Sequence, residues 1–177
     1  MKIFVIGGSG SGKSEWAEKK AMEISSDGKA VYAATMRPYG EEAEERIKHH
    51  REARKDRDFI TAELPYDLRG LSEYADTADT VLIEDLSNLL TNLKFFKNMS
   101  FSDAEEEIKS QISYISAIFK NIIIVSNDVF SDGIEYSDET FEFIKSLSGL
   151  NRGFAAEADI FAEVVVGIPL IKQEIQE

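Results

Sequence analysis

The chain has 177 residues, no cysteine and a formal net charge of −13. This length suits one α/β domain over residues 1–177, and without cysteine neither disulfides nor thiolate metal sites can form. The acidic balance argues against a nucleic-acid surface, which depends on basic patches, so we expect a small phosphorylated substrate. The apolar run before Gly7 is about five residues long, far below the roughly 20 that span a bilayer, and no cleavable signal pattern accompanies it. We therefore expect a cytoplasmic protein with no membrane span.

A glycine-rich segment at residues 7–14 follows the first predicted strand and matches the G-x-x-x-x-G-K-[ST] phosphate loop at every fixed position. Glycines let successive backbone N–H groups turn inward around phosphate oxygens. Lys13 adds charge toward the β and γ phosphates, and the Ser14 hydroxyl suits Mg²⁺. We expect a bound nucleoside triphosphate, GTP or ATP. The expected contacts are Gly7, Gly8, Ser9, Gly10, Ser11, Gly12, Lys13 and Ser14.

Apolar runs alternate with stretches of helical periodicity along the whole chain. This alternation predicts an α/β fold with a mostly parallel sheet flanked by helices. The fully apolar run at 121–126 predicts a central strand close to the first one. Strands are expected at 2–6, 30–35, 58–63, 80–86, 121–127 and 162–171, and helices at 13–25, 41–56, 66–75, 87–97, 103–119 and 138–157.

The predicted helix at 41–56 begins with acidic residues and continues with basic ones. This pattern is ordinary complementarity to the helix dipole. However, Arg46, His50 and Arg54 are spaced four apart, so they share one face that could lie against a triphosphate. A neutral imidazole can attack phosphorus, and flanking arginines would stabilise the charge that develops. His50 is the preferred nucleophile; His49, about 100° around the helix, and a purely structural role for both histidines stay open.

Polar side chains also stand where predicted strands end, which is where ligands bind in open parallel sheets. Glu84 and Asp85 follow the fourth strand and resemble a Walker B element, and we expect only one of them to join Ser14 as an Mg²⁺ ligand. Residues 126–128, Ser-Asn-Asp, either orient a substrate or cap the next helix. The second and third strands end in further candidate contacts to a nucleoside: Ala33, Ala34, Thr35 and Glu63.

Taken together, these segments resemble the bifunctional adenosylcobinamide kinase/adenosylcobinamide-phosphate guanylyltransferase family of cobalamin biosynthesis. The most specific feature is Arg46-Ile47 followed by His50 and Arg54, similar to the family's R-I-x-x-H-x-x-x-R. The other matching segments are the phosphate loop, Tyr-Ala-Ala-Thr at 32–35, Thr-Ala-Glu at 61–63, Thr-Asn-Leu at 91–93, Asn-Asp-Val at 127–129 and Gly-Ile-Pro at 167–169.

The resemblance implies a RecA-like P-loop fold, a trimeric assembly, a corrinoid substrate and two reactions. A nucleotide phosphorylates adenosylcobinamide, and GTP then passes GMP through a histidine to adenosylcobinamide phosphate. The family's histidine falls on His50, and Glu84 takes the Walker B position. The resemblance further implies GTP contacts at Arg51, Glu52, Ala53, Arg54 and Glu63.

Departures from the family pattern occur at Gly10, where an arginine is usual, and in residues 129–136 and 139–152. They fall where acceptor and subunit contacts are expected. Two other hypotheses therefore stay open at this stage. One is a P-loop kinase for another small alcohol with a structural His50, and the other is a nucleotide-binding regulatory protein without turnover.

Overall fold

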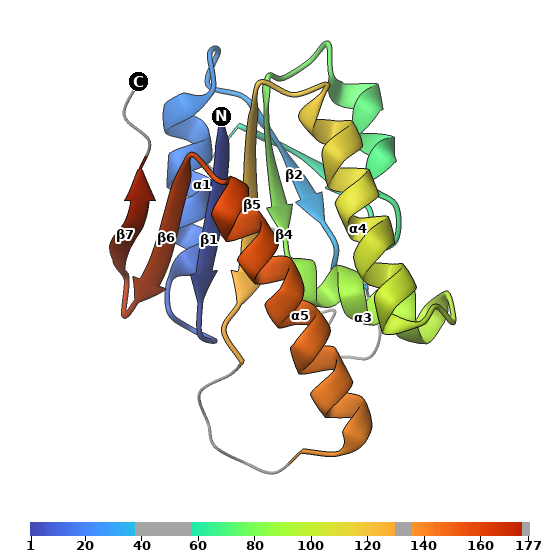
Figure 1. Ribbon diagram of the computed structural model, residues 1–177. Helices are drawn as coiled ribbons and strands as arrows, with labels where there is room; N and C mark the ends of the chain where they lie inside the picture. The colour runs from blue at the N-terminus through green and yellow to red at the C-terminus, as the bar shows by residue number, and fades with distance from the viewer. Residues whose placement is uncertain (38–57, 130–135, 175–177) are drawn as a thin grey trace.

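The computed structural model describes residues 1–37, 58–129 and 136–174 (Figure 1). In this part of the chain seven strands form one sheet, in the order β3-β2-β4-β5-β1-β6-β7. All neighbouring pairs are parallel except β6 and β7. The strands are β1 (Lys2–Gly7), β2 (Ala30–Ala34), β3 (Phe59–Glu63), β4 (Thr80–Glu84), β5 (Asn121–Asn127), β6 (Ile160–Val165) and β7 (Ile168–Glu174).

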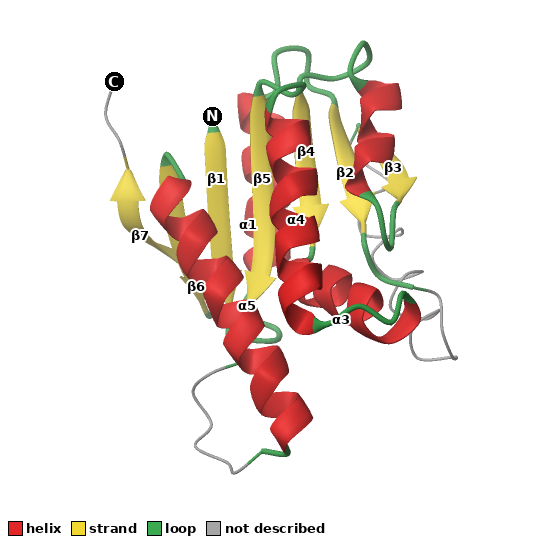
Figure 2. Ribbon diagram, turned by 45° about the vertical axis from the view of Figure 1, so that its right-hand side comes forward, coloured by secondary structure: helices red, strands yellow, loops and turns green. Residues whose placement is uncertain are grey.

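Helices cover both faces of the sheet (Figures 1 and 2). On one face, α1 (Lys13–Ile24) packs Ala17 and Ala21 against strand residues such as Ile3 and Val5. Phe4, between those two strand residues, belongs to the core on the opposite face, as expected when successive side chains alternate. That core is covered by η1 (Leu68–Tyr74), α3 (Leu86–Phe96), α4 (Phe101–Ser116) and α5 (Asp138–Glu157).

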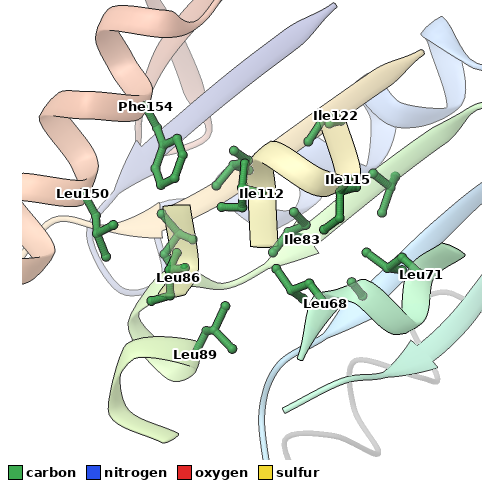
Figure 3. Packing of buried hydrophobic residues seen from close by; sticks show 14 of the residues in the cluster. Leu68, Leu71, Ile83, Leu86, Leu89, Ile112, Ile115, Ile122, Leu150 and Phe154 are labelled. Carbon is green, nitrogen blue, oxygen red and sulfur yellow. The ribbon is translucent and has the colours of Figure 1, made fainter. Parts of the chain in front are cut away.

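The larger core lies under α3, α4 and α5, and Figure 3 shows part of it. Leu89 of α3, Ile112 of α4 and Ile83 of β4 all belong to it. The predicted central position of the run at 121–126 is confirmed, because β5 pairs with both β1 and β4. In the described part of the chain, no helix combines the length and apolar character needed to cross a membrane.

The single strand predicted at 162–171 is wrong. The segment forms the antiparallel hairpin of β6 and β7, which turns at Val166 and Gly167 with φ values of 49° and 78°. The unbroken apolar pattern hid this turn, because a tight hairpin turn of this kind usually carries Asn-Gly. The helix expected at 66–75 is present as the 3₁₀ helix η1, whose buried Leu68 and Leu71 match its repeat of three residues. The helix expected at 41–56 lies outside the described residues.

Candidate nucleotide site

The phosphate loop joins β1 to α1 at the carboxyl edge of the sheet. Gly10 and Gly12 adopt φ values of 70° and 87°, a region that residues with a side chain avoid. The Ser11 N–H donates to Gly8 O at 3.2 Å and tightens the loop, and the Trp16 N–H donates to Gly12 O at 3.0 Å and begins the helix. The segment thus has the compact shape that a phosphate cradle needs, at the positive end of α1.

Lys13 stands in the first turn of α1 with only 7% of its surface exposed. Its Nζ donates to Gly8 O at 3.2 Å, so the side chain folds back over the loop. A lysine held in this way lies within the region that the phosphates of a bound nucleotide would occupy. A phosphate oxygen would replace the carbonyl as its partner, and a full negative charge makes the stronger bond.

Ser14 and Glu84 meet although they come from different parts of the chain. The Ser14 hydroxyl donates to Glu84 Oε1 at 2.5 Å. Glu84 lies at the end of β4, and β5 separates β4 from β1, the strand that leads into the loop. The structure therefore joins the two residues that the sequence nominated as Mg²⁺ ligands.

Asp85 has a different role from Glu84. The sequence predicted that only one of the two reaches the metal. The Glu84–Asp85 peptide bond is cis. Asp85 is the N-cap of α3 and accepts hydrogen bonds from Asn88 N at 2.8 Å and from Ser87 Oγ at 2.6 Å. Both of its carboxylate oxygens are engaged, because Asn127 Nδ2 donates to the second at 3.0 Å.

The carboxyl group of Glu84 is buried, and one of its oxygens has no hydrogen-bond partner among the described residues. Burial, followed by the negative charge of Asp85, raises the pKa of Glu84 to about 7, while Ser14 and Lys13 oppose the shift. Glu84 Oε2 is also buried and has no hydrogen-bond partner among the described residues. Mg²⁺ prefers carboxylate and hydroxyl oxygens and keeps much of its shell as water and substrate phosphate, so these two side chains fit it. No cluster of three His, Cys, Asp or Glu residues that could hold a metal occurs within the described ranges, and a phosphate-bound Mg²⁺ does not require one.

Thr35, predicted to contact a base or ribose, is completely buried. Its hydroxyl accepts from Asp85 N at 2.7 Å and lies 2.8 Å from Glu84 O, to which it donates. Its backbone oxygen accepts from Asn92 Nδ2 at 2.8 Å. Thr35 therefore holds the backbone between Glu84 and Asp85, and its contact to a nucleoside stays a prediction.

The neighbours of Thr35 differ in what they offer. Ala33 is fully buried in the core, and its nucleoside contact stays a prediction. Ala34 is half-buried and lies in register between Glu84 on β4 and Glu63 on β3. Glu63 is exposed at the carboxyl end of β3, on the same edge of the sheet as the loop. Ala34 and Glu63 stay predicted contacts.

The polar residues that end β5 hold other parts of the site. Asn127 Nδ2 donates to Asp85 and to Ser87 Oγ, and Ser126 donates to Asn151 Oδ1 at 2.7 Å. Helix α5 is capped by Ser137, so the interpretation that residues 126–128 cap the next helix is wrong. Asn127 orients Asp85, the residue beside Glu84, and a contact of residues 126–128 with a substrate stays a prediction. Sequence reasoning did not identify Asn92 or the target of Asn127, because both depend on pairings distant in the chain.

The turn of the β6–β7 hairpin lies against the phosphate loop, a contact the sequence did not indicate. Gly167 N donates to Ser11 O at 2.7 Å. A Cβ on Gly12 would lie 3.2 Å from Gly167 Cα, and one on Gly7 would lie 2.7 Å from Val164 O. The loop thus has glycines at 7 and 12 for close packing against this hairpin as well as for the ligand.

The predicted nucleophile and its neighbours lie outside the described residues, and their roles stay predictions. These residues are His50, Arg51, Glu52, Ala53 and Arg54. In the chain, this stretch lies between the end of β2 and the start of the edge strand β3.

Residues 3–171 match the family described as "CobU: Cobinamide kinase / cobinamide phosphate guanyltransferase". The chain belongs to this family. The family prediction made from the sequence motifs is confirmed, and so is the assignment to an enzyme class, because the family description names a kinase and a guanyltransferase. The CobU family match spans the phosphate loop, the Ser14–Glu84 pair and the β6–β7 turn.

Two curated relatives show the same extent of similarity to this CobU family member. The bifunctional adenosylcobalamin biosynthesis protein CobP of Pseudomonas aeruginosa PAO1 is 28% identical over 172 residues, which cover 96% of each chain. The bifunctional adenosylcobalamin biosynthesis protein CobU of Escherichia coli K12 is 29% identical over 182 residues, covering 95% of this chain and 97% of that protein. The similarity thus runs almost end to end on both sides.

Two solved structures have a similar fold. The ATPase domain of G40P superposes with a TM-score of 0.59 at 12% identity and covers 99% of this chain and 77% of that one. The flagellar accessory protein FlaH from Methanocaldococcus jannaschii gives a TM-score of 0.51 at 14% identity, covering 98% and 78%. At such identities the likeness concerns the fold alone, and it confirms the predicted P-loop class with a mostly parallel sheet.

Proposed function

We propose that this protein phosphorylates the aminopropanol hydroxyl of adenosylcobinamide and then transfers GMP from GTP to the resulting phosphate, giving adenosylcobinamide-GDP. The observation that carries the proposal is the Ser14–Glu84 contact beside a phosphate loop over which Lys13 folds back, in a chain that belongs to the CobU family. The family description indicates the acceptor, and the three side chains would bind and stabilise the phosphates that react.

In the kinase step, the acceptor oxygen bonds to the γ-phosphorus, the bond to the bridging oxygen breaks, and the nucleoside diphosphate leaves with that electron pair. The hydroxyl proton passes to solvent. Lys13 would neutralise the β and γ oxygens, and Ser14 and Glu84 would hold Mg²⁺, which spreads the charge of those oxygens when bound. Fixed charges and alignment supply most of the rate in phosphoryl transfer, so a rigid loop suits this step.

In the guanylyl step, an imidazole nitrogen of His50 bonds to the α-phosphorus of GTP and pyrophosphate leaves. A phosphate oxygen of adenosylcobinamide phosphate then attacks the same phosphorus, the N–P bond breaks, and the histidine is regenerated. Splitting the transfer in two allows one activated donor to serve an acceptor that arrives later. The proposed contacts to guanosine and phosphate are Arg51, Glu52, Ala53, Arg54 and Glu63.

The proposed assembly is a homotrimer, and sedimentation equilibrium would check it.

Labelled GTP tests both reactions. With label in the α-phosphate, denatured protein should retain radioactivity that acid releases and base does not, as a phosphoramidate requires. The label should persist in His49→Asn and disappear in His50→Asn. Labelling that disappears only in His49→Asn assigns the nucleophile to the other ring.

The two remaining hypotheses give different results in the same experiment. Transfer of γ-label to an alcohol other than adenosylcobinamide, with no labelled protein, would indicate a kinase for another small alcohol. Binding of GTP without any turnover would indicate a regulatory protein. Either result contradicts the proposed pair of reactions.

A further inference from the structure

An exposed apolar side chain lies beside the phosphate loop. Val166, in the turn between β6 and β7, is 86% exposed. The next residue, Gly167, donates its N–H to Ser11 O at 2.7 Å. Val166 is therefore one residue away from a direct contact with the loop that would hold the phosphates.

The turn itself does not favour valine at this position. Val166 has a φ of 49° and Gly167 a φ of 78°, the conformation of a hairpin turn in which Asn-Gly is preferred. A β-branched residue at positive φ is strained. The strain is not offset by burial, because the side chain is almost fully exposed. A residue kept in an unfavourable conformation next to a binding site suggests a role in binding.

The order of the strands indicates on which side of the phosphate loop the nucleoside of a bound triphosphate would lie. Glu84 and Ser14 mark the side of the loop toward β4, where the γ-phosphate and its metal would lie. Strand β6 lies next to β1 on the opposite side. A triphosphate with its γ end at Glu84 therefore has its nucleoside end on the side of the β6–β7 turn.

We propose that the Val166 side chain packs against the nucleoside of the phosphoryl donor in the kinase step. This inference rests on the proposed kinase function and adds a nucleoside contact to it. The guanosine contact proposed at Glu63 lies at the end of β3, at the other edge of the sheet. Two nucleoside positions follow, one for transfer of the γ-phosphoryl group and one for attack at the α-phosphorus.

Two substitutions remove the apolar side chain and keep the turn: Val166→Gly and Val166→Asn. Glycine and asparagine both accept positive φ. The readouts are the KM of ATP and of GTP in phosphorylation of adenosylcobinamide, and inhibition by inorganic tripolyphosphate, which lacks a nucleoside. Losing one apolar contact should raise the KM of the donor about fivefold in both variants. The inhibition constant of tripolyphosphate should stay as in the wild type. Ile168→Thr, two residues on and 63% exposed, is the control and should leave the KM unchanged.

Other outcomes overturn the inference. If the KM and the inhibition constant of tripolyphosphate rise together, the turn only supports the loop. If neither changes, Val166 contacts no nucleoside, and a changed mass in sedimentation would instead assign it to a subunit contact. Failure of the kinase function itself shows differently, because wild-type protein would then phosphorylate no adenosylcobinamide at all.

Discussion

Ser14 Oγ and Glu84 Oε1 lie 2.5 Å apart although 70 residues separate them in the chain. The contact couples the first turn of α1 to the end of β4, so the hydroxyl and the carboxylate that suit Mg²⁺ face each other before any ligand arrives. The second oxygen of Glu84 is buried and has no hydrogen-bond partner within the described part of the chain. A buried carboxylate oxygen without a partner costs free energy, and a cation held as proposed by Ser14 and Glu84 would offset that cost.

Glu84→Gln should stabilise the metal-free protein at alkaline pH. Folding raises the pKa of Glu84 from 4.5 to about 7, so the folded state loses stability as pH rises through this window. Above pH 7 the full penalty applies, at most about 3 kcal/mol. Glutamine keeps an oxygen for Ser14 and cannot ionise.

Urea unfolding in EDTA at several pH values between 5 and 8.5 measures this difference. The free energy of unfolding of the variant should exceed that of the wild type most at pH 8.5 and least at pH 5. A gap between the two that does not depend on pH would contradict a buried, titrating Glu84. Added Mg²⁺ and nucleotide should stabilise the wild type more than the variant, because the metal removes the penalty.

Lys13→Met should weaken binding of a fluorescent GTP analogue about 10- to 100-fold, as expected for the loss of a charged hydrogen-bond donor. The aliphatic part of the side chain is retained, so the fold should persist. Lys19→Met is the matched control on the same helix. Lys19 lies in an exposed ion pair with Glu15 at 2.7 Å, and its loss should leave affinity within about twofold of the wild type. Equal losses in both variants would mean that net charge, rather than the loop, governs binding.

The sequence predicted the phosphate loop and the Glu84 position because both depend on local patterns. The conformation of residues 7–14 depends on their glycines. The uninterrupted apolar run of β5 indicated a central strand, and β5 pairs with β1. The hairpin turn at Val166 and Gly167 was missed for the opposite reason. Its local residue preference disagrees with its conformation, so only the tertiary structure reveals it.

Thr35 shows a second limit of sequence reasoning. A hydroxyl at the end of a strand suits a ligand or the backbone of a neighbour equally well, and the choice depends on what β4 presents to it. Here the Thr35 hydroxyl bonds to the backbone between Glu84 and Asp85. The stretch that carries His50 lies outside the described residues, so the sequence remains the source for its role.

Thr35→Val should lower the free energy of unfolding by about 1–3 kcal/mol, because the Asp85 N–H loses its acceptor in a buried setting. Kinase activity should fall further than stability alone explains, since the Glu84 backbone is then less well fixed. Thr35→Ser retains the hydroxyl and should keep most of the activity. Thermal unfolding and phosphorylation assays on both variants check this. An active, stable Thr35→Val would mean that the hydroxyl is dispensable.

Asn127→Asp should destabilise the protein at pH 8 and much less at pH 4. Asn127 Nδ2 donates to Asp85 Oδ2 at 3.0 Å, and the substitution replaces this donor with a second negative charge. Like charges this close raise the pKa of one partner, because the two cannot both ionise freely. A loss of about 1–3 kcal/mol at pH 8 is expected, as for a buried group that loses its hydrogen-bond partner.

The double variant Asp85→Asn with Asn127→Asp provides the control, because it restores one donor and one carboxylate with their positions exchanged. An asparagine at 85 still offers an oxygen to Asn88 N, which the cap of α3 requires. The double variant should therefore recover most of the stability lost in Asn127→Asp at pH 8. If it is as unstable as the sum of the single variants, the two side chains do not act as a pair, and the support of α3 by β5 must come from other contacts.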